Sequence, residues 1–166
     1  MSTVSVNTAA HTATHVATNM LRGLKQVIAG CALDVVNIAR DWAVLERGVA
    51  TWLASHHLRR LVLEVWEKTN PGQLVGRFDF TIDYDYYVDG EGDLWLDPDT
   101  VGWAIRKRGS FPSGCDYRIV ADNSPGRENV DGWSNTSFGL TQGLRRYAVG
   151  TTIGGGSMGV GLAYWN

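Results

Sequence analysis

The segment "LRRLVLEVWEKTNPGQLVGRFDFTIDYDY", residues 58–86, decides the fold class of this chain. Its apolar and polar residues alternate, first through Leu61 and Leu63 and then from Phe78 onward. A period of two is typical of half-buried strands. The residues "TNPG" at 69–72 lie between the two runs and have the chemistry of a turn. We therefore expect an antiparallel hairpin with one apolar face and one acidic, solvated face.

Two amphipathic helices are expected before this hairpin. Apolar residues recur every three or four positions in each, which places them on one helical face. The first helix carries Val16, Met20, Leu24, Val27 and Ile28, and the second carries Val35, Ile38, Trp42, Leu45, Val49 and Trp52. Gly30 is typical of a helix end, and Asp34 is placed to accept the free N–H groups at the start of the second helix.

A third helix and a further strand are expected after the hairpin. Asp97 is a typical N-cap residue, Pro98 takes the first helical position, and Gly109 follows a basic last turn. The residues "DYRIVAD", 116–122, are expected to form another strand. Helices and strands in this order predict an α+β fold in a single domain, residues 1–166, with a mainly antiparallel sheet.

The composition of the sequence changes from Ser124 onward. Residues 124–166 hold ten of the twenty glycines, and their periodicity is weak. A long irregular stretch attached to a compact domain is usually functional or disordered. Aromatic residues such as Trp133 and Tyr147 argue against disorder. We therefore expect a segment that wraps around the domain, with a glycine hinge at "GGGSMG" (154–159) before a short terminal strand.

Three motifs resemble metal or nucleotide sites, but their spacing or sequence context does not match those sites. The acidic residues around Asp89 do not match the positions of a calcium loop, so we interpret them as a solvated hairpin and a helix cap. His11 and His15 have the spacing of zinc ligands but lack a third ligand and the glutamate of a metalloprotease. The glycines at 154–159 match a dinucleotide fingerprint, but no helix and strand follow them. No metal or cofactor is expected.

The overall composition is that of an ordinary globular protein. The chain has 166 residues, 44% of them hydrophobic, and a formal net charge of −2. This charge gives no general attraction to nucleic acid or to an anionic membrane. The N-terminal sequence lacks the basic and apolar regions of a signal peptide, and the two cysteines, Cys31 and Cys115, are expected to be reduced. We therefore expect a cytoplasmic protein.

The order of several segments resembles the bacterial HORMA domains of antiphage cyclic-oligonucleotide signalling (CBASS) operons. The matching segments are "NTAAHTATHVATNMLRGLK", "WLASHHLRRLVLEVWEK", "LVGRFDFTIDY", "LWLDPDTVGWAIRKRG", "CDYRIV", "PGRENVDGWS" and the terminal "GTTI" and "GLAYW". The resemblance implies three helices packed on a mainly antiparallel sheet, a core over residues 14–123, and a C-terminal safety belt over residues 124–166. The belt wraps a short peptide, called a closure motif, whose backbone pairs with an exposed strand edge.

The resemblance also implies a role and partners. Such a protein is a non-catalytic regulatory switch that, in its closed, peptide-bound state, binds and activates a cGAS-like nucleotidyltransferase. An AAA+ remodelling ATPase reopens it by pulling the N-terminal segment, residues 1–13. The residues expected to contact the peptide are Tyr117, Ile119, Ala121, Trp133 and Tyr147, and those expected to form the handle for the ATPase are Ser2, Thr3, Val4, Ser5 and Val6. Because the chain ends at Asn166, directly after the final strand, the closure motif is expected to come from another protein.

Two other functions remain open from the residues alone. One is a constitutive structural or adaptor subunit of a protein assembly, which would keep a single conformation. The other is a small metal-dependent enzyme that uses His11, His15 or the acidic residues around Asp89. No set of nucleophile, base and acid is made compelling by its spacing, so the enzyme is the weaker alternative.

Overall fold

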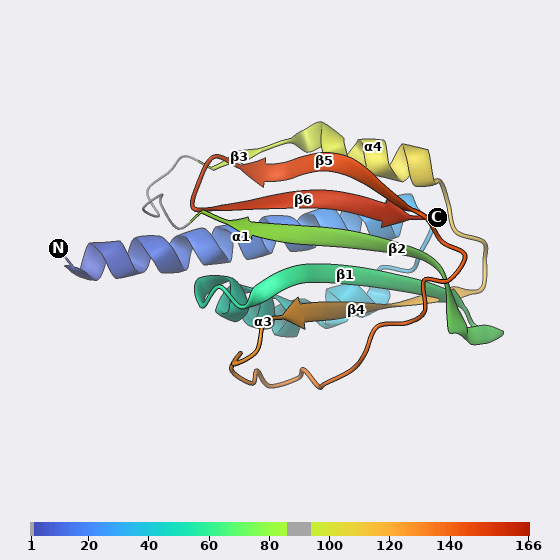
Figure 1. Cartoon of the computed structure of the whole chain (residues 1–166), viewed down its shortest axis with the longest axis horizontal. Helices are drawn as coiled ribbons and strands as arrows, with labels where there is room; N and C mark the ends of the chain where they lie inside the picture. The colour runs from blue at the N-terminus through green and yellow to red at the C-terminus, as the bar shows by residue number, and fades with distance from the viewer. Residues whose placement is uncertain (1, 86–93) are drawn as a thin grey trace.

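The described residues of the computed structural model, 2–85 and 94–166, form four helices and six strands, with side chains described from residue 11 onward (Figure 1). The helices are α1 (Ser2–Gly30), α2 (Val36–Arg40), α3 (Trp42–Ala54) and α4 (Pro98–Arg108). The strands are β1 (Leu58–Glu67), β2 (Asn70–Tyr84), β3 (Trp95–Leu96), β4 (Cys115–Asn123), β5 (Arg146–Gly154) and β6 (Met158–Trp165). The predicted α+β class is confirmed.

All six strands lie in one sheet in the order β3-β5-β6-β2-β1-β4, and neighbouring strands are antiparallel. The predicted hairpin lies at its centre, where Leu63 of β1 faces Phe78 of β2. The predicted position of the turn was wrong, because residues 68–69 form the turn and Pro71 already lies in β2. Irregular pairing at the end of β1 shifts the register and brings Glu67 opposite Asn70. Proline is tolerated at this position because it lies at the start of a strand.

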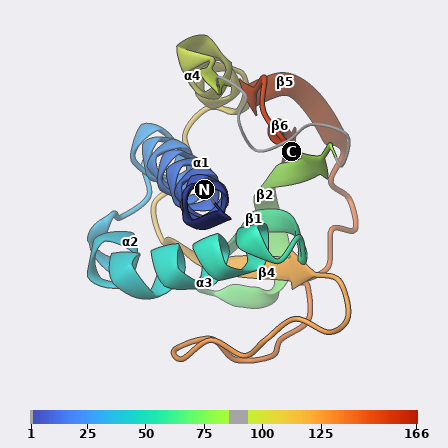
Figure 2. The same ribbon diagram turned by 90° about the vertical axis from the view of Figure 1, so that its left-hand side faces the viewer.

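Helix α1 lies against the sheet, with α3 on one side and α4 on the other (Figure 2). Its predicted apolar stripe is confirmed, since Val16, Met20, Leu24, Val27 and Ile28 are all buried. The predicted start and end of α4 are also confirmed. Asp97 accepts the backbone N–H of Asp99 at 2.8 Å, Pro98 is the first helical residue, and Gly109 follows the last turn with a φ of 75°.

The second predicted helix is divided in two. The backbone leaves the helical conformation at Asp41 (φ −93°, ψ 7°), between α2 and α3. The carboxylate of Asp41 pairs with the neighbouring Arg40 at 3.1 Å, and aspartate is a weak helix former because it bonds locally in this way. The side chain of Asp34 accepts the N–H of Val36, as expected for the start of a helix. The buried stripe survives the interruption, since Ile38, Leu45, Val49 and Trp52 all lie in the core.

The two faces of the sheet differ in chemistry. The helices cover a face of apolar side chains, among them Leu63 and Phe78, which are both fully buried. The other face was expected to be solvated, and this expectation was wrong. Asp79 and Glu64, which point to that face, are 1% and 0% exposed. Asp83 on the same face of β2 is exposed as predicted, whereas Tyr86 and the acidic residues around Asp89 lie outside the described residues.

The C-terminal part of the chain completes the sheet. The predicted terminal strand is confirmed as β6, which pairs with β2 on one side and with β5 on the other. Residues 155–157 join β5 to β6 as a hairpin turn, with Gly155 at a φ of 87°. The glycine-rich stretch at 154–159 is therefore a turn inside the sheet, not the predicted hinge.

Candidate functional site

Strand β4 forms one edge of the sheet, and in the described part of the chain no strand pairs with its outer side. The residues that follow it, 124–145, form a crossing segment that has little regular structure. Figure 1 shows this segment arching away from β4 and returning along the sheet to β5. Its end bridges to β2, where Leu140 pairs with Gln73. The crossing segment thus begins and ends on the sheet and passes in front of the free edge of β4.

The first half of the crossing segment is anchored on the helix side of the sheet. Trp52 of α3 donates its indole N–H to the carbonyl of Glu128 at 2.8 Å, and Trp133 donates its own to the carbonyl of Val44 at 3.0 Å. The two indole rings meet edge to face, with centroids 5.0 Å apart. Gly48 makes this contact possible, because a Cβ at that position would lie 2.2 Å from Nε1 of Trp133.

The second half is anchored on the opposite face of the sheet. The fully buried carboxylate of Glu64 accepts the backbone N–H of Gly139 at 2.7 Å and the Nε–H of Arg118 at 2.7 Å. Arg118 also donates to the carbonyl of Ser137 at 2.6 Å. The ring of Phe138 lies against two guanidinium groups, those of Arg60 and Arg77, at 5.1 and 4.8 Å. The crossing segment therefore passes around the edge of β4 from one face of the sheet to the other.

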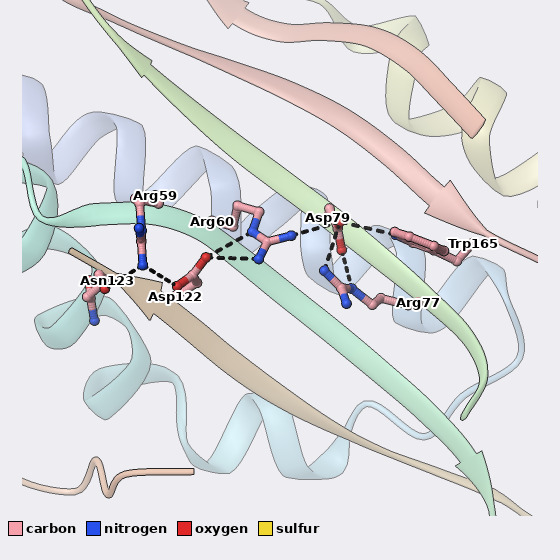
Figure 3. Close-up of polar contacts among 7 residues, drawn as sticks. All are labelled: Arg59, Arg60, Arg77, Asp79, Asp122, Asn123 and Trp165. Atoms are coloured by element: carbon pink, nitrogen blue, oxygen red, sulfur yellow. Dashed lines mark hydrogen bonds and ion pairs between the residues drawn. The ribbon is translucent and has the colours of Figure 1, made fainter. Parts of the chain in front are cut away.

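A chain of ion pairs underlies this second anchor and crosses four strands (Figure 3). Asp122 of β4 binds Arg60 of β1 at 3.0 Å, and Arg60 also lies 3.8 Å from Asp79 of β2. Asp79 binds Arg77 through both carboxylate oxygens, at 2.6 and 3.1 Å, and accepts the indole N–H of Trp165 on β6 at 3.1 Å. These bonds satisfy the buried carboxylate, which would otherwise be strongly destabilising.

Two cavities lie between β4, α3 and the crossing segment. One has a volume of about 350 Å³ and is lined by the end of β4, Trp52 and residues 133–136. The other has a volume of about 540 Å³ and is lined by the middle of β4, residues of α2 and α3, and Trp133. Ile119 and Trp133 line both cavities, so the two are neighbours along the strand. Together they form a hollow that follows the free edge of β4.

Four of the five residues predicted to contact a peptide lie at this hollow, namely Tyr117, Ile119, Ala121 and Trp133. The first three point to the helix side of the sheet, because they lie opposite the core residues Val65, Leu63 and Leu61. Burial raises the pKa of the Tyr117 phenol above its ordinary value, and its hydroxyl donates to the carbonyl of Asp34.

Tyr147 is not brought into the site. It lies on β5, four strands away from β4, and stacks on Tyr164 at 5.2 Å. The backbone of the predicted handle, Ser2, Thr3, Val4, Ser5 and Val6, is helical and continuous with the rest of α1. Whether a remodelling ATPase grips it stays a prediction.

Sequence reasoning missed the second anchor of the crossing segment, on the face opposite the helices. Glu64 and Asp79 looked like the polar positions of alternating strands, and their burial depends on contacts with residues far along the chain. Arg118 likewise looked like a polar residue of an alternating strand, since it lies opposite Glu64 in β4. Phe138 carried one usable signal, since an aromatic residue in a glycine-rich stretch usually packs against another part of the protein.

The alternatives based on metal or nucleotide chemistry gain no support from the described side chains. His11 and His15 are exposed, and no group of three or more metal-ligating residues occurs among the residues that were described. The glycines at 154–159 lie in the β5–β6 turn. Cys31 and Cys115 are free thiols, and burial raises the pKa of Cys31 to about 11. No described helix is long and apolar enough to cross a membrane.

Comparison with known proteins agrees with this architecture. The family model of bacterial HORMA domain 2 matches residues 1–166, the whole chain. The chain belongs to this family. No curated protein matches it.

Solved structures with the same fold come from distant relatives. A crystal structure of the mitotic checkpoint complex has a TM-score of 0.59 at 9% identity, covering 78% of this chain and 73% of the other. The structure of C. elegans HTP-2 bound to the HIM-3 closure motif has a TM-score of 0.56 at 12% identity, covering 81% and 72%. The E. coli MS115-1 CdnC:HORMA-deltaN complex has a TM-score of 0.56 at 12% identity, covering 91% and 85%. The HORMA-like fold is therefore confirmed.

Proposed function

We propose that this HORMA domain is a regulatory peptide-binding switch. An extended closure peptide from a partner protein adds to the free edge of β4, and the crossing segment encloses it. The observation that carries this proposal is the path of residues 124–145, which are anchored on α3 at one end and on Glu64 at the other. The outer edge of the nine-residue β4, which no described strand covers, is a ready template for β-augmentation.

In this proposal the ligand is retained by topology as well as by contacts. A peptide lying along β4 would be surrounded by the strand, by α3 and by the crossing segment. It would leave only by sliding out along the strand or after one of the two anchors opens. Dissociation is therefore slow, and its rate depends on the anchors. Residues 124–166 act as the safety belt, residues 14–123 as the core, and residues 1–13 as the handle for an AAA+ remodelling ATPase.

The partner in signalling is a cGAS-like nucleotidyltransferase, which the peptide-bound form binds and activates. The whole-chain match to a bacterial HORMA family supports this part, as does the likeness to a HORMA protein in complex with CdnC. In this role the chain itself is non-catalytic and works in the cytoplasm. Reconstitution with the nucleotidyltransferase that co-purifies from the native host, with nucleotide synthesis as the readout, tests it.

The peptide-binding step has a sharper test. Peptides selected from a displayed random library on the wild-type protein are measured for their dissociation rate. The double variant Trp133→Ala, Phe138→Ala removes one side chain from each anchor and is expected to release them at least about tenfold faster, since buried aromatic anchors are typically worth 2 kcal/mol or more.

Trp103→Ala is the matched control for this test. This tryptophan lies on α4, is 53% exposed and lines neither cavity, so its replacement is expected to leave the dissociation rate unchanged. Equal rates for wild type and double variant, or a library without binders, would show that the crossing segment does not enclose a peptide.

A further inference from the structure

The two cavities beside β4 differ in the chemistry of their walls. The larger one is enclosed mainly by apolar side chains, among them Ile38, Val44 and Leu45 from the helices and Tyr117 from β4. The smaller one has walls that are half polar and half apolar. Its polar residues include Asp122, Asn123, Arg127, Asn135 and Thr136. A peptide that spans both cavities therefore meets an apolar environment at one position and a more polar one at another.

The smaller cavity is lined by a guanidinium group that has no carboxylate partner among the described residues. Arg40 and Arg118, which line the larger cavity, are paired with Asp41 and Glu64. Arg127, which lines the smaller one, forms no ion pair within the described part of the chain. The planar guanidinium of arginine matches the geometry of a carboxylate or a phosphate and can bind either through two hydrogen bonds.

Arg127 is also held in place before any ligand arrives. Its Nη2 donates to the side-chain oxygen of Asn135 at 2.6 Å, and its Nη1 donates to that of Asn129 at 3.1 Å. Its guanidinium lies over the ring of Trp52 at 5.2 Å from the centroid. A cation that is already oriented loses little conformational entropy on binding, which favours recognition by it.

The charge balance around this end of β4 is positive. Asp122 is shared between Arg59 and Arg60 and forms no ion pair with Arg127. Counting Arg77 and Asp79 of the same network gives four guanidinium groups, from Arg59, Arg60, Arg77 and Arg127, against two carboxylates, from Asp79 and Asp122. Glu128 follows Arg127, but its side chain is exposed and forms no ion pair among the described residues.

We propose that the peptide held by this site carries an acidic side chain for Arg127 and a bulky apolar side chain for the larger cavity. The proposal rests on the peptide-binding function proposed above. Alternate residues of a strand point to the same side, so the two side chains are two or four positions apart in an extended peptide. The cavities meet at Ile119 and Trp133, which agrees with this short spacing.

The test uses a displayed library of random peptides of about twelve residues, longer than the nine-residue β4. Wild type, Arg127→Gln and Arg127→Glu are selected in parallel and the enriched sequences are compared. Wild type is expected to enrich an acidic residue two or four positions from a bulky apolar one. Arg127→Gln is expected to lose the acidic preference, and Arg127→Glu to replace it with a basic one.

The matched control is Arg106→Glu, which reverses the charge of an exposed arginine on α4 that lines neither cavity. It is expected to select the same sequences as wild type. For a selected wild-type binder, replacing its acidic residue with alanine is expected to weaken binding about tenfold, as for other hydrogen bonds to a charged group. Raised salt is expected to narrow that difference, because the site is partly open to solvent.

The outcomes separate this inference from the function on which it rests. Peptides that bind wild type without an acidic residue at fixed spacing, or an acidic preference that survives in Arg127→Glu, would overturn the inference and leave peptide binding intact. A library without any binder that depends on Trp133 and Phe138 would overturn both. A change of preference from acidic to basic in Arg127→Glu alone would establish the inference.

Discussion

The helix-covered face of the sheet and the face opposite to it each have a buried centre, but the two centres are built from different side chains. The first is apolar throughout its centre, with Leu63 and Phe78 fully buried. The second buries Glu64, Arg77 and Asp79, which are 0%, 5% and 1% exposed. Apolar side chains pack against any apolar neighbour, whereas a buried charge needs a partner at a fixed distance and angle.

This difference bears on function. An apolar face holds the helices through many interchangeable contacts, so it tolerates change without losing its partners. The charged face holds the crossing segment through a few directional bonds, chiefly those of Glu64 to Gly139 and Arg118 to Ser137. A contact of a few directional bonds can open and close again, which suits a segment that must admit and release a peptide.

The largest effect is expected for Asp79→Ala, which breaks the charged face at its centre. The substitution leaves Arg77 buried without its carboxylate and Trp165 without its acceptor. The expected loss in the free energy of unfolding is about 4 kcal/mol, as for other buried ion pairs that lose one partner. Chemical denaturation measures it. The control is Asp83→Ala on the same face of β2, where the side chain is exposed and the loss should stay within about 0.5 kcal/mol.

A double substitution tests directly whether the charged face can be rebuilt from apolar side chains. Replacing both charges of the central pair, in Arg77→Met, Asp79→Leu, makes this part of the face resemble the apolar one. We expect the double variant to be more stable than Asp79→Ala by about 2 kcal/mol or more, since removing both partners avoids an unpaired buried charge. A double variant as unstable as Asp79→Ala would mean that the loss of stability comes from the lost contacts of these side chains and not from an unpaired buried charge.

Glu64→Ala is expected to cost about 3 kcal/mol, somewhat less than Asp79→Ala, because its partner Arg118 is partly exposed and can be solvated. The substitution should also loosen the crossing segment, since the backbone N–H of Gly139 loses its acceptor. Trypsin cleavage after Arg127 and Arg145 should therefore accelerate, as followed by mass spectrometry. Glu67→Ala, at the exposed end of the same strand, is the control. Unchanged cleavage would show that the bond to Gly139 does not hold the segment.

Gly48→Ala tests the anchor on the helix side. The new methyl group would collide with Trp133, so the crossing segment should loosen, with a net loss of about 1–2 kcal/mol. In a Trp133→Ala background the same change should instead stabilise by about 1 kcal/mol, because alanine is the better helix former. A double-mutant cycle measured by thermal unfolding gives both values. If Gly48→Ala changed the free energy of unfolding with the same sign in both backgrounds, the close contact between residue 48 and Trp133 would be refuted.

The smallest effect is expected for Trp103→Ala on α4. This tryptophan is exposed and contacts the ammonium of Lys107 at 4.6 Å from its ring centroid. Neither face of the sheet depends on it, so the free energy of unfolding should change by about 0.5 kcal/mol or less. A larger loss in the same denaturation experiment would mean that α4 contributes more to the core than its exposure indicates.

Several elements could be predicted from the sequence because short-range rules specify them. The period of two places β1 and β2, and a stripe of apolar residues places α1. The helix α4 begins at Pro98 and ends before Gly109 because capping chemistry acts within a few residues. A wrapping segment was predicted for residues 124–166, since this stretch is rich in glycine yet keeps aromatic residues that must pack. Only residues 124–145 are irregular, and β5, which the sequence did not predict, takes up residues 146–154.

The structure brings most of the predicted contact residues together. Residues of β4 and Trp133 lie at the hollow, whereas Tyr147 lies on β5, because the order of strands in a sheet is set by long-range pairing. The break at Asp41 escaped prediction because the apolar stripe continues across it. Local sequence patterns therefore predict neither the order of the strands nor the break at Asp41.

The sequence by itself determined α1, α4, β1, β2, β4 and β6, the apolar face of the sheet and the α+β class. The tertiary structure alone decided which charges are buried. Asp83 and Asp79 lie on the same face of one strand, yet the first is exposed and the second is buried, bound to Arg77 and Trp165. Alternation fixes the side of a strand to which a residue points. Only the packing of the rest of the chain determines whether the side chain on that side meets water or another residue.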